Sequence, residues 1–530
     1  MATQRRQGEP YEISGKRIAF TNYHYIRPAG FGWYDDQGKG VAVIGNQGPW
    51  DAHIRVFERP FGIQIRALPA GRFEKPHLLE PKKPWEGSGV TLNHILYDEE
   101  DGYFKAWGTC STQNRDFSCY LQSHDFESWE RPELGIVEFG SSRKNNLIET
   151  GKDSIWHGSL FKDPSDPKER WKFLGEGTIT RKEYDAYCKK YPKDWDPKSD
   201  RVDVPYETHI GPGNMIAAVK GAVSEDGFRW TFLPEPLVVE HSDTLVTAYY
   251  DTRLKKYVGY FRDWMVADRS PDAPGDRGLS WMVGRRSIGR AETDNFHHFP
   301  LSEIIFEPGP EILGPSDVLY TNCHTFVPHT SDQHLFFPTI WHMTNDATSI
   351  AIASSSDGKV LHWLPGSPIL ITPPFMEWDG GCIFAGGNLL ELPDGSWALP
   401  YSGSNFPHKY PRKGPIKHGR GFATWKKGRM VAVEAKELGQ FTTFAFMAPG
   451  TKMRINALTS RGGNIKVEVT DLKRQVIPGH SFDDCKPIIG DQYLSPVIWN
   501  SSDNIGVPKR TPICLRFKLD QAQLFFVDFE

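Results

Sequence analysis

The sequence lacks the long apolar run that a membrane-spanning helix needs. No stretch of about 18 predominantly apolar residues occurs in the 530-residue chain. The N-terminal segment MATQRRQGEP also lacks the apolar core of a secretory signal. We therefore expect the chain as written to be cytoplasmic, and to be periplasmic or secreted if a signal peptide has been removed from it.

Cysteine pairs and common metal motifs are absent as well. The seven cysteines are odd in number, widely scattered and without a Cys-x-x-Cys pair, which favours free thiols over a disulfide framework or a zinc site. Neither a His-Glu-x-x-His motif nor an Asp-x-Asp-x-Asp loop occurs. From these motifs we expect no cofactor and no metal ligand set.

The chain also has no excess of basic charge. It carries 62 Lys and Arg against 66 Asp and Glu, for a formal net charge of -4. Such a balance creates no positive field to attract nucleic acid or anionic lipid. We expect neither of these partners, and a neutral or weakly charged ligand instead.

Glycine, proline and aromatic residues are plentiful. The chain has 50 Gly, 40 Pro and 13% aromatic residues. Aromatic residues favour strands, and Gly and Pro favour tight turns. The composition therefore predicts many short strands rather than long helices.

One hairpin pattern occurs twice in the sequence. Residues 85–108 read WEGSGVTLNHILYDEEDGYFKAWG, and residues 378–401 read WDGGCIFAGGNLLELPDGSWALPY. Both open on Trp-acid-Gly and place two apolar runs around an Asp-Gly turn, which is typical of a β-hairpin. A third hairpin, in residues 317–337, turns at a Ser-Asp pair. In all three an acid precedes the turn aspartate by fifteen positions, and these acids are Glu86, Asp317 and Asp379.

Two further hairpins, beginning at Trp156 and Asp243, bring the number of repeated units to five. Most units continue with a short strand, a Ser-x-Asp turn and an aromatic residue, as in SEDGFRW and SSDGKVLHW. Repeated four-stranded sheets arranged around an axis protect their own edges. The sequence therefore predicts an all-β fold, a five-bladed β-propeller with a C-terminal β-sandwich, and the alternative is an ordinary β-sandwich.

The predicted organisation has three parts. Residues 1–84 form an N-terminal arm whose strands pack on the propeller, and residues 85–439 form the propeller. In residues 440–530 the pattern changes to alternating strands with frequent turns, which predicts the sandwich. This last part could bind carbohydrate, brace the propeller or join two copies of the chain.

The repeated acids are the candidate catalytic residues. In a propeller the first strands of the blades line the central channel, so residues at their starts converge at one mouth. Asp243 and Asp379 are predicted as an acid/base or nucleophile pair, with Glu86 and Asp317 orienting the substrate or tuning pKa values. Paired carboxylates suit hydrolysis of a glycosidic bond. For each acid the alternative is a structural role, because such carboxylates often cap turns.

Histidines and Asn322 fall at the same first strands, and several arginines and tryptophans are further candidates for substrate binding. They could hydrogen-bond sugar hydroxyls, pair with an anionic group or stack on a sugar face. Four neutral histidines could instead hold a structural metal ion in the central channel. The predicted substrate-binding residues are His94, His157, His241, Asn322, His324, Arg262, Arg286, Trp341 and Trp378.

The blade pattern resembles that of the five-bladed propeller glycoside hydrolases, the superfamily of families 32 and 43. HSDT, GRRSIGRAET and HSFDDCKPIIGD resemble a poorly characterised bacterial branch of it. The resemblance implies a glycoside hydrolase. This chain departs from the family pattern at three places. Glu86 stands where blade one would carry Asn-Asp-Pro-Asn-Gly, and blade three offers Asp243 rather than a clear Glu. The Lys-Asp-Pro at Asp163 resembles the Arg-Asp-Pro of blade two but falls near a hairpin turn.

Three functions are compatible with these features. The first is a glycoside hydrolase that removes a terminal sugar from an oligo- or polysaccharide. The second is a glycan lyase, in which His241 or His157 abstracts a proton next to a uronate carboxylate bound by Arg262 or Arg286. The third is a carbohydrate-binding propeller without catalytic activity.

Overall fold

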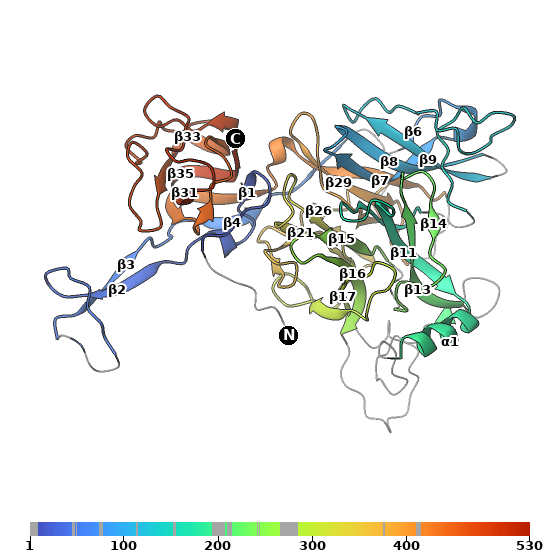
Figure 1. Ribbon diagram of the computed structural model, residues 1–530, viewed down its shortest axis with the longest axis horizontal. Helices are drawn as coiled ribbons and strands as arrows, with labels where there is room; N and C mark the ends of the chain where they lie inside the picture. The colour runs from blue at the N-terminus through green and yellow to red at the C-terminus, as the bar shows by residue number, and fades with distance from the viewer. Residues whose placement is uncertain are drawn as a thin grey trace, which may run out of the picture.

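A computed structural model describes residues 9–44, 48, 50–73, 78–112, 115–151, 155–192, 207–208, 215–240, 242, 244–265, 285–374, 377–409 and 415–530. Within these residues almost all regular structure is β, and the single α-helix is α1 (Arg181–Lys190). The prediction of an all-β fold is confirmed. None of the helices in the described ranges is long and apolar enough to cross a membrane. Figure 1 shows a larger lobe built from the middle of the chain and a smaller C-terminal lobe from which a hairpin projects.

The larger lobe begins with three antiparallel sheets that follow one another along the chain. The first has the order β6 (Leu78–Leu79), β7 (Val90–Asp98), β8 (Tyr103–Ser111), β9 (Asp116–Ser123). The second has the order β10 (Gly158–Lys162), β11 (Trp171–Ile179), β13 (Met215–Ser224), β12 (Glu207–Thr208), with β14 (Thr231–Phe232) beside β13. The third has the order β15 (Thr247–Asp251), β16 (Lys256–Met265), β17 (Arg285–Thr293), β18 (Glu303–Phe306).

The next two sheets are formed by the same four passes of the chain. One contains β19 (Asp317–Thr321), β22 (Thr339–His342), β23 (Ala347–Ile350) and β26 (Leu370–Ile371). The other contains β20 (His324–Phe326), β21 (His334–Phe336), β24 (Ala353–Ser355) and β25 (His362–Trp363). Backbone hydrogen bonds from Phe337 to Cys323 (2.9 Å) and from Ala351 to Pro338 (3.0 Å) join the two sheets. They therefore behave as one interrupted unit.

The last sheet of this lobe has the order β27 (Cys382–Ala385), β29 (Trp397–Ser404), β30 (His418–Trp425), β5 (Gly71–Arg72), with β28 (Leu390–Glu391) beside β29. An N-terminal strand, β5, thus completes the sheet made by the end of the lobe. The following strand, β6, belongs to the first sheet. The segment from β5 to β6 therefore connects the last sheet to the first.

Apolar clusters lie between each sheet and the next. Trp107 and Trp171 pack between the first and second sheets, and their rings lie 5.0 Å apart. Leu92 of β7 shares a cluster with Ala398 and Phe422 of the last sheet, so the first and last sheets also pack together. Burial of these side chains, roughly 25 cal/mol for each Å² of apolar surface, is the main force that holds neighbouring sheets together.

The Ser-x-Asp turns are built by local hydrogen bonds. In the turn after β13, Asp226 accepts backbone N–H groups from Phe228 (2.7 Å) and Arg229 (2.8 Å). The carbonyl of Gly227 then accepts the indole N–H of Trp107, from the preceding sheet, at 2.7 Å. The turn at Gly358 accepts the hydroxyl of Tyr260 in the same way, at 2.9 Å. Each turn therefore connects its own sheet to the preceding one.

The smaller lobe is formed by strands from both ends of the chain. Its main sheet has the order β34 (Asp491–Pro496), β33 (Met453–Thr470), β35 (Pro512–Phe529), β31 (Val431–Thr442), β4 (Gln64–Ala67), with β1 (Arg17–Ala19) and β32 (Phe446–Met447) also on β35. Strand β31 spans residue 440, where the sequence predicts a domain boundary. Two N-terminal strands, β1 and β4, pair here rather than with the larger lobe.

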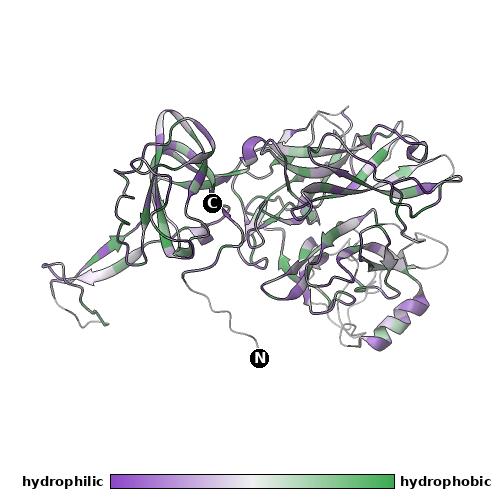
Figure 2. Ribbon diagram, turned by 45° about the horizontal axis from the view of Figure 1, so that its top comes forward, coloured by the Kyte–Doolittle hydropathy of each residue, from purple (hydrophilic) through white to green (hydrophobic). Residues whose placement is uncertain are grey.

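The two lobes share buried contacts. The guanidinium of Arg17 is 1% exposed and pairs with Asp528 of the smaller lobe at 2.7 Å and with Glu391 of the larger lobe. One apolar cluster also runs from Phe337 in the larger lobe to Val527 in the smaller one. Figure 2 shows the apolar segments of the strands in both lobes.

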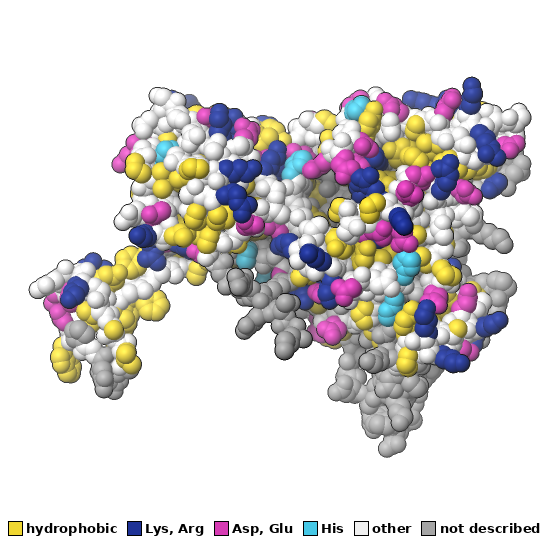
Figure 3. Space-filling model, viewed as in Figure 1, with side chains coloured by type: hydrophobic (Ala, Val, Ile, Leu, Met, Phe, Trp, Pro, Cys, Tyr) yellow, Lys and Arg dark blue, Asp and Glu magenta, His cyan; other side chains and the backbone are white. Residues whose placement is uncertain are grey.

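A two-stranded hairpin, β2 (Gly30–Tyr34) with β3 (His53–Phe57), projects from the smaller lobe. Phe31 lies opposite Val56, and Trp33 lies opposite Ile54, so one face of this ribbon is apolar. Figure 3 shows hydrophobic side chains on parts of this ribbon.

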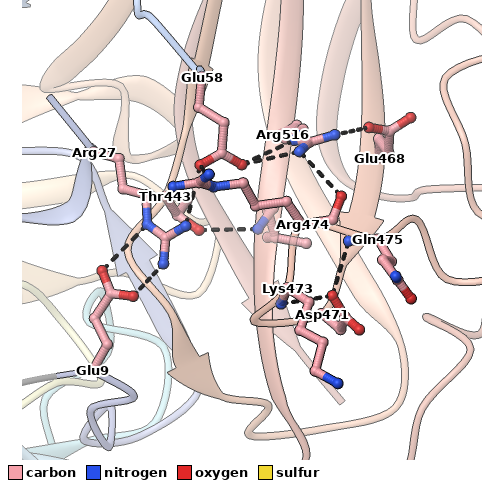
Figure 4. Close-up of polar contacts among 11 residues, drawn as sticks. Glu9, Arg27, Glu58, Thr443, Glu468, Asp471, Lys473, Arg474, Gln475 and Arg516 are labelled. Atoms are coloured by element: carbon pink, nitrogen blue, oxygen red, sulfur yellow. Dashed lines mark hydrogen bonds and ion pairs between the residues drawn. The ribbon is translucent and has the colours of Figure 1, made fainter. Parts of the chain in front are cut away.

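Glu58 directly follows β3, at the base of the ribbon, and pairs with three arginines, which Figure 4 shows. The distances are 3.0 to 3.2 Å, and the arginines are Arg27, Arg474 and Arg516.

Candidate active site

A cavity of about 290 Å³ lies where the first strands of the sheets of the larger lobe meet. Its wall includes residues of β7, β10, β19 and β27 and the segment just before β15. Residues of β29 and β30 complete the wall on one side. The lining residues are Leu92, Asn93, Ile95, Trp156, His157, Gly158, Thr244, Leu245, Tyr320, Thr321, Phe384, Ala385, Gly386, Gly387, Pro400, Tyr401, Ser402, His408 and Arg420.

The cavity wall combines aromatic rings with hydrogen-bonding groups. Trp156, Tyr320, Phe384 and Tyr401 supply the aromatic surface. The basic lining residues are His157, His408 and Arg420, and the described lining residues include no Asp or Glu. This combination suits a polar ring-shaped ligand, which needs flat apolar surfaces and directed hydrogen bonds.

His157 and Glu176 form a pair at the edge of the cavity. The Nδ1 atom of His157 lies 2.9 Å from Oε1 of Glu176, and both side chains are about one third exposed. His157 directly precedes β10, and Glu176 lies on the adjacent strand β11. The strands approach closely at Gly158, where a Cβ atom would lie 2.1 Å from the carbonyl oxygen of Leu174. Only glycine fits there, and the close approach brings the imidazole and carboxylate together.

Arg420 enters the cavity wall from β30, opposite Ser402 of β29. Its Nη1 donates a hydrogen bond to the carbonyl of Leu92 at 2.9 Å. Burial lowers the pKa of Arg420 to about 10, and no carboxylate among the described residues offsets that effect. The guanidinium therefore has donors available to a ligand.

Two of the predicted site residues, His241 and Asp243, lie outside the described residues. Their neighbours are described. The hydroxyl of Ser242 accepts the backbone N–H of Arg262 at 2.9 Å, and Thr244 lines the cavity. The side chain of Arg262 is 3% exposed and lies 4.9 Å from the ring of Trp264.

Glu86 is a buried structural acid rather than a lining residue. It ends the 3₁₀ helix η2 (Pro84–Glu86), is fully buried, and pairs with Arg131. It also accepts the backbone N–H of Lys83 at 3.2 Å. These contacts use its carboxylate to anchor the start of the first unit.

Asp379 lies one layer behind the cavity. Its carboxylate is buried and accepts the hydroxyl of Tyr401 at 2.8 Å, with Arg72 at 3.3 Å. Burial and the bond to Asp379 both raise the pKa of Tyr401. Trp378 stacks on Tyr401, with ring centres 5.6 Å apart. Asp379 and Trp378 therefore position a lining tyrosine without lining the cavity themselves.

Asp317 also makes structural contacts, at the start of β19. It lies 2.9 Å from Nδ1 of His342 and accepts the backbone N–H of Gly314 at 2.8 Å. The repeated position of Glu86, Asp317 and Asp379 thus reflects three buried or capping carboxylates. It does not produce a ring of acids around the cavity within the described residues.

Trp341 and Arg286 support the lining residue Tyr320. The indole of Trp341 meets the Tyr320 ring edge-on at 5.9 Å and donates to Asp346 at 2.8 Å. The guanidinium of Arg286 lies 4.3 Å from the centre of the same tyrosine ring. Both predicted binding residues therefore lie behind the cavity wall.

His94, His324 and Asn322 are buried in structural contacts. His94 Nε2 lies 2.6 Å from the carbonyl oxygen of Ile155, and burial lowers its pKa to about 3. Burial also lowers the pKa of His324 well below its ordinary value. Asn322 accepts the hydroxyl of Thr247 at 3.0 Å. No group of three or more potential metal ligands occurs among the described residues.

Of the predicted binding residues, His157 is described as a lining residue, whereas several lining residues were not predicted. Ser402 and Arg420 line the cavity from the second and third strands of their sheet, and Glu176 contacts the lining residue His157 from the second strand of its own sheet. The sequence argument for the catalytic acids considered only the starts of first strands. Strand pairing of a hairpin could have placed Glu176 opposite His157. The sequence GRGFATW around Arg420 carries no comparable signal.

Protein-family models and curated proteins gave no match to this chain. A search of solved structures found glycoside hydrolases at low identity. A family 32 β-fructofuranosidase from Bombyx mori is 10% identical over 86% of this chain and 93% of its own, with a TM-score of 0.35. An α-L-arabinofuranosidase from Podospora anserina is 8% identical over 68% and 98%, with a TM-score of 0.36.

A family 130 glycoside hydrolase that targets β-1,2-mannosidic linkages is 11% identical over 68% of this chain and 94% of its own, with a TM-score of 0.38. Likeness at this level identifies no specific family and no activity for this chain. The function is therefore best argued from the cavity itself.

Proposed function

We propose that the larger lobe is a five-bladed β-propeller, that the smaller lobe is a β-sandwich, and that the axial cavity cleaves glycosidic bonds. Support for the propeller comes from the chain order of the sheets and from the clusters between neighbouring sheets, including the last and first. The two interrupted sheets of β19 to β26 together form the fourth blade. The cavity lies where the first strands of the five blades meet.

The observation that carries the functional proposal is the composition of the cavity wall. Trp156, Tyr320 and Phe384 offer flat faces for a sugar ring, and Asn93, Thr244 and Ser402 offer polar atoms for its hydroxyls. A volume of about 290 Å³ lies near the lower end of the usual range for small-molecule sites. This favours a terminal sugar over an internal segment of a glycan.

Hydrolysis of a glycosidic bond requires a proton donor for the leaving oxygen and a second carboxylate that acts as base or nucleophile. Glu176 is a described acid in contact with a lining residue, His157, at 2.9 Å. Asp243 directly precedes the lining residue Thr244 in the sequence. We assign the two catalytic carboxylates to Glu176 and Asp243. Kinetic measurements on variants determine which one donates the proton and which one acts as base or nucleophile.

The test compares Glu176→Gln and Asp243→Asn with the wild-type protein on a panel of glycans, by release of reducing ends. Loss of a catalytic carboxylate should lower turnover by roughly a thousandfold or more. Glu235→Gln is the control, because Glu235 pairs with Lys190 on the surface. Turnover within about tenfold of wild type in both site variants would contradict carboxylate catalysis.

A second candidate, a glycan lyase, is favoured by His157 and Arg420 in the same cavity. Arg420 would hold the carboxylate of a uronate, and His157 would take the proton from the adjacent carbon. The resulting electron pair forms a C=C bond as the C–O bond of the leaving sugar breaks. The product then absorbs ultraviolet light, whereas a hydrolysis product does not. Binding without either product would indicate a carbohydrate-binding protein.

A further inference from the structure

We propose that the cavity selects a sugar carrying a negative charge, a carboxylate or a sulfate ester, and that Arg420 binds this group. The proposal rests on the carbohydrate site proposed above and specifies its substrate class. Net charge and composition favour a neutral or weakly charged ligand instead. The local arrangement of charges in the cavity leads to the opposite conclusion.

Arg420, which is partly buried, differs from Arg17 and Arg131, two arginines with buried side chains. Arg17 is paired with Asp528 and Glu391, and Arg131 is paired with Glu86. Arg420, in contrast, has the carbonyl of Leu92 as its hydrogen-bond acceptor and no carboxylate partner among the described residues. A cation held away from water without an anion is costly, so an anionic ligand would compensate it.

Among the described residues that line the cavity, no carboxylate competes for Arg420. The lining residues described here include two histidines and no Asp or Glu, so an anion entering the cavity meets no carboxylate in the described wall. Glu176 contacts the lining residue His157 at 2.9 Å, and Asp379 accepts the hydroxyl of the lining residue Tyr401 at 2.8 Å and pairs with Arg72. These two described acids therefore contact groups other than Arg420.

The chemistry of the guanidinium fits such a group. It carries five N–H donors in a planar fork, which can bind a carboxylate or sulfate through two parallel hydrogen bonds. One donor is used by Leu92. Ser402, the cross-strand neighbour of Arg420, also lines the cavity and offers a hydroxyl donor. Together they form the proposed anion subsite on one wall, next to Phe384, which is the cross-strand neighbour of Ser402 on its other side.

The experiment measures binding to matched sugars by isothermal titration calorimetry. The probes are D-glucuronate with D-glucose, D-galacturonate with D-galactose, and galactose 6-sulfate. Wild type should bind one anionic sugar at least about tenfold more tightly than its neutral counterpart, as expected for a hydrogen-bonded charge. The uronate and sulfate probes show which anion the subsite prefers.

The variants isolate the role of Arg420. Arg420→Gln should lower the ratio of anionic to neutral affinity to about one, whereas Arg420→Lys should retain part of the preference. Ser402→Ala gives a second test that does not alter the charge and should weaken binding of the anionic sugar more than binding of its neutral counterpart. Circular dichroism and thermal unfolding check that each variant is folded.

The outcomes separate this proposal from the proposed function. Neutral sugars that bind as tightly as anionic ones and are cleaved would overturn the charge preference alone. An unchanged preference in folded Arg420→Gln and Ser402→Ala would also overturn it. If no sugar binds and no glycan is cleaved, the carbohydrate site fails, and this proposal fails with it.

Discussion

The imidazole of His157 and the carboxylate of Glu176 lie 2.9 Å apart at the edge of the cavity in the larger lobe. His157 directly precedes β10 and Glu176 lies on the neighbouring strand β11, next to the cross-strand pair of Gly158 and Gly175. Each of the two side chains could serve as the proton-transferring group of the reaction. Their separate substitution therefore distinguishes the two chemistries proposed for the site.

We expect Glu176→Gln and His157→Gln to differ in their effect on turnover. If hydrolysis occurs, the Glu176 variant should lose roughly a thousandfold and the His157 variant about tenfold, because only the carboxylate enters the bond-breaking step. If elimination occurs, the order should reverse. Single-turnover rates on the best glycan measure both losses. Equal and small losses would exclude the pair from catalysis.

Glu86→Gln should destabilise the protein while leaving sugar binding intact. The substitution leaves Arg131 buried without its anionic partner, which costs about 3 kcal/mol in such pairs. Glu100→Gln is the matched control, because Glu100 is 61% exposed and solvent screens its ion pairs with Lys162 and Arg170. Urea unfolding measures the difference. Equal stability of the two variants would contradict the structural role of Glu86.

Tyr260→Phe should weaken the contact between the third and fourth proposed blades. The hydroxyl of Tyr260 donates to the carbonyl of Gly358, and its removal leaves that buried acceptor without its donor. The expected loss is about 1 kcal/mol in the free energy of unfolding. Tyr103→Phe, on the first sheet and half-exposed, should change stability far less. A Tyr260 variant as stable as wild type would show that this hydrogen bond does not hold the blades.

Protonation of His94 should contribute to destabilisation in mild acid. Its pKa in the folded protein is about 3, below the ordinary value near 6.5 that applies to the unfolded chain. The unfolded state therefore takes up a proton first as the pH falls. Stability that is fully present above about pH 6.5 is lost as pH decreases toward 3, by about 1.4 kcal/mol per pH unit.

His94→Gln should flatten this dependence, because glutamine can donate to the Ile155 carbonyl but does not titrate. His362→Gln, at an exposed position, should leave the dependence as it is in wild type. Urea midpoints between about pH 7.5 and about pH 5 measure the slopes. Parallel slopes in wild type and His94→Gln would contradict the assignment.

Much of the local structure could be predicted from the sequence. The segments around Asp101 and Asp394 turn where the pattern predicts, between β7 and β8 and between β28 and β29. The Ser-x-Asp turns form through contacts within a few residues, as at Asp226. Such features are readable because the interacting groups are neighbours in the chain.

The roles of the repeated acids could not be predicted in this way. Glu86 and Asp379 stand at matched positions in the sequence, yet each is neutralised by a cation from elsewhere, Arg131 or Arg72. Whether a carboxylate faces a ligand or an arginine depends on side chains far away in the chain. Sequence spacing records the repeat but does not identify these partners.

The sequence by itself determined the all-β composition, the hairpin repeat and the turns, because strand alternation and turn chemistry act over a few residues. The tertiary structure decided which polar groups meet at the cavity. Arg420 reaches the carbonyl of Leu92 across 328 positions of the chain. Only packing of the last sheet against the first brings these residues together, since no local preference encodes a contact between distant strands.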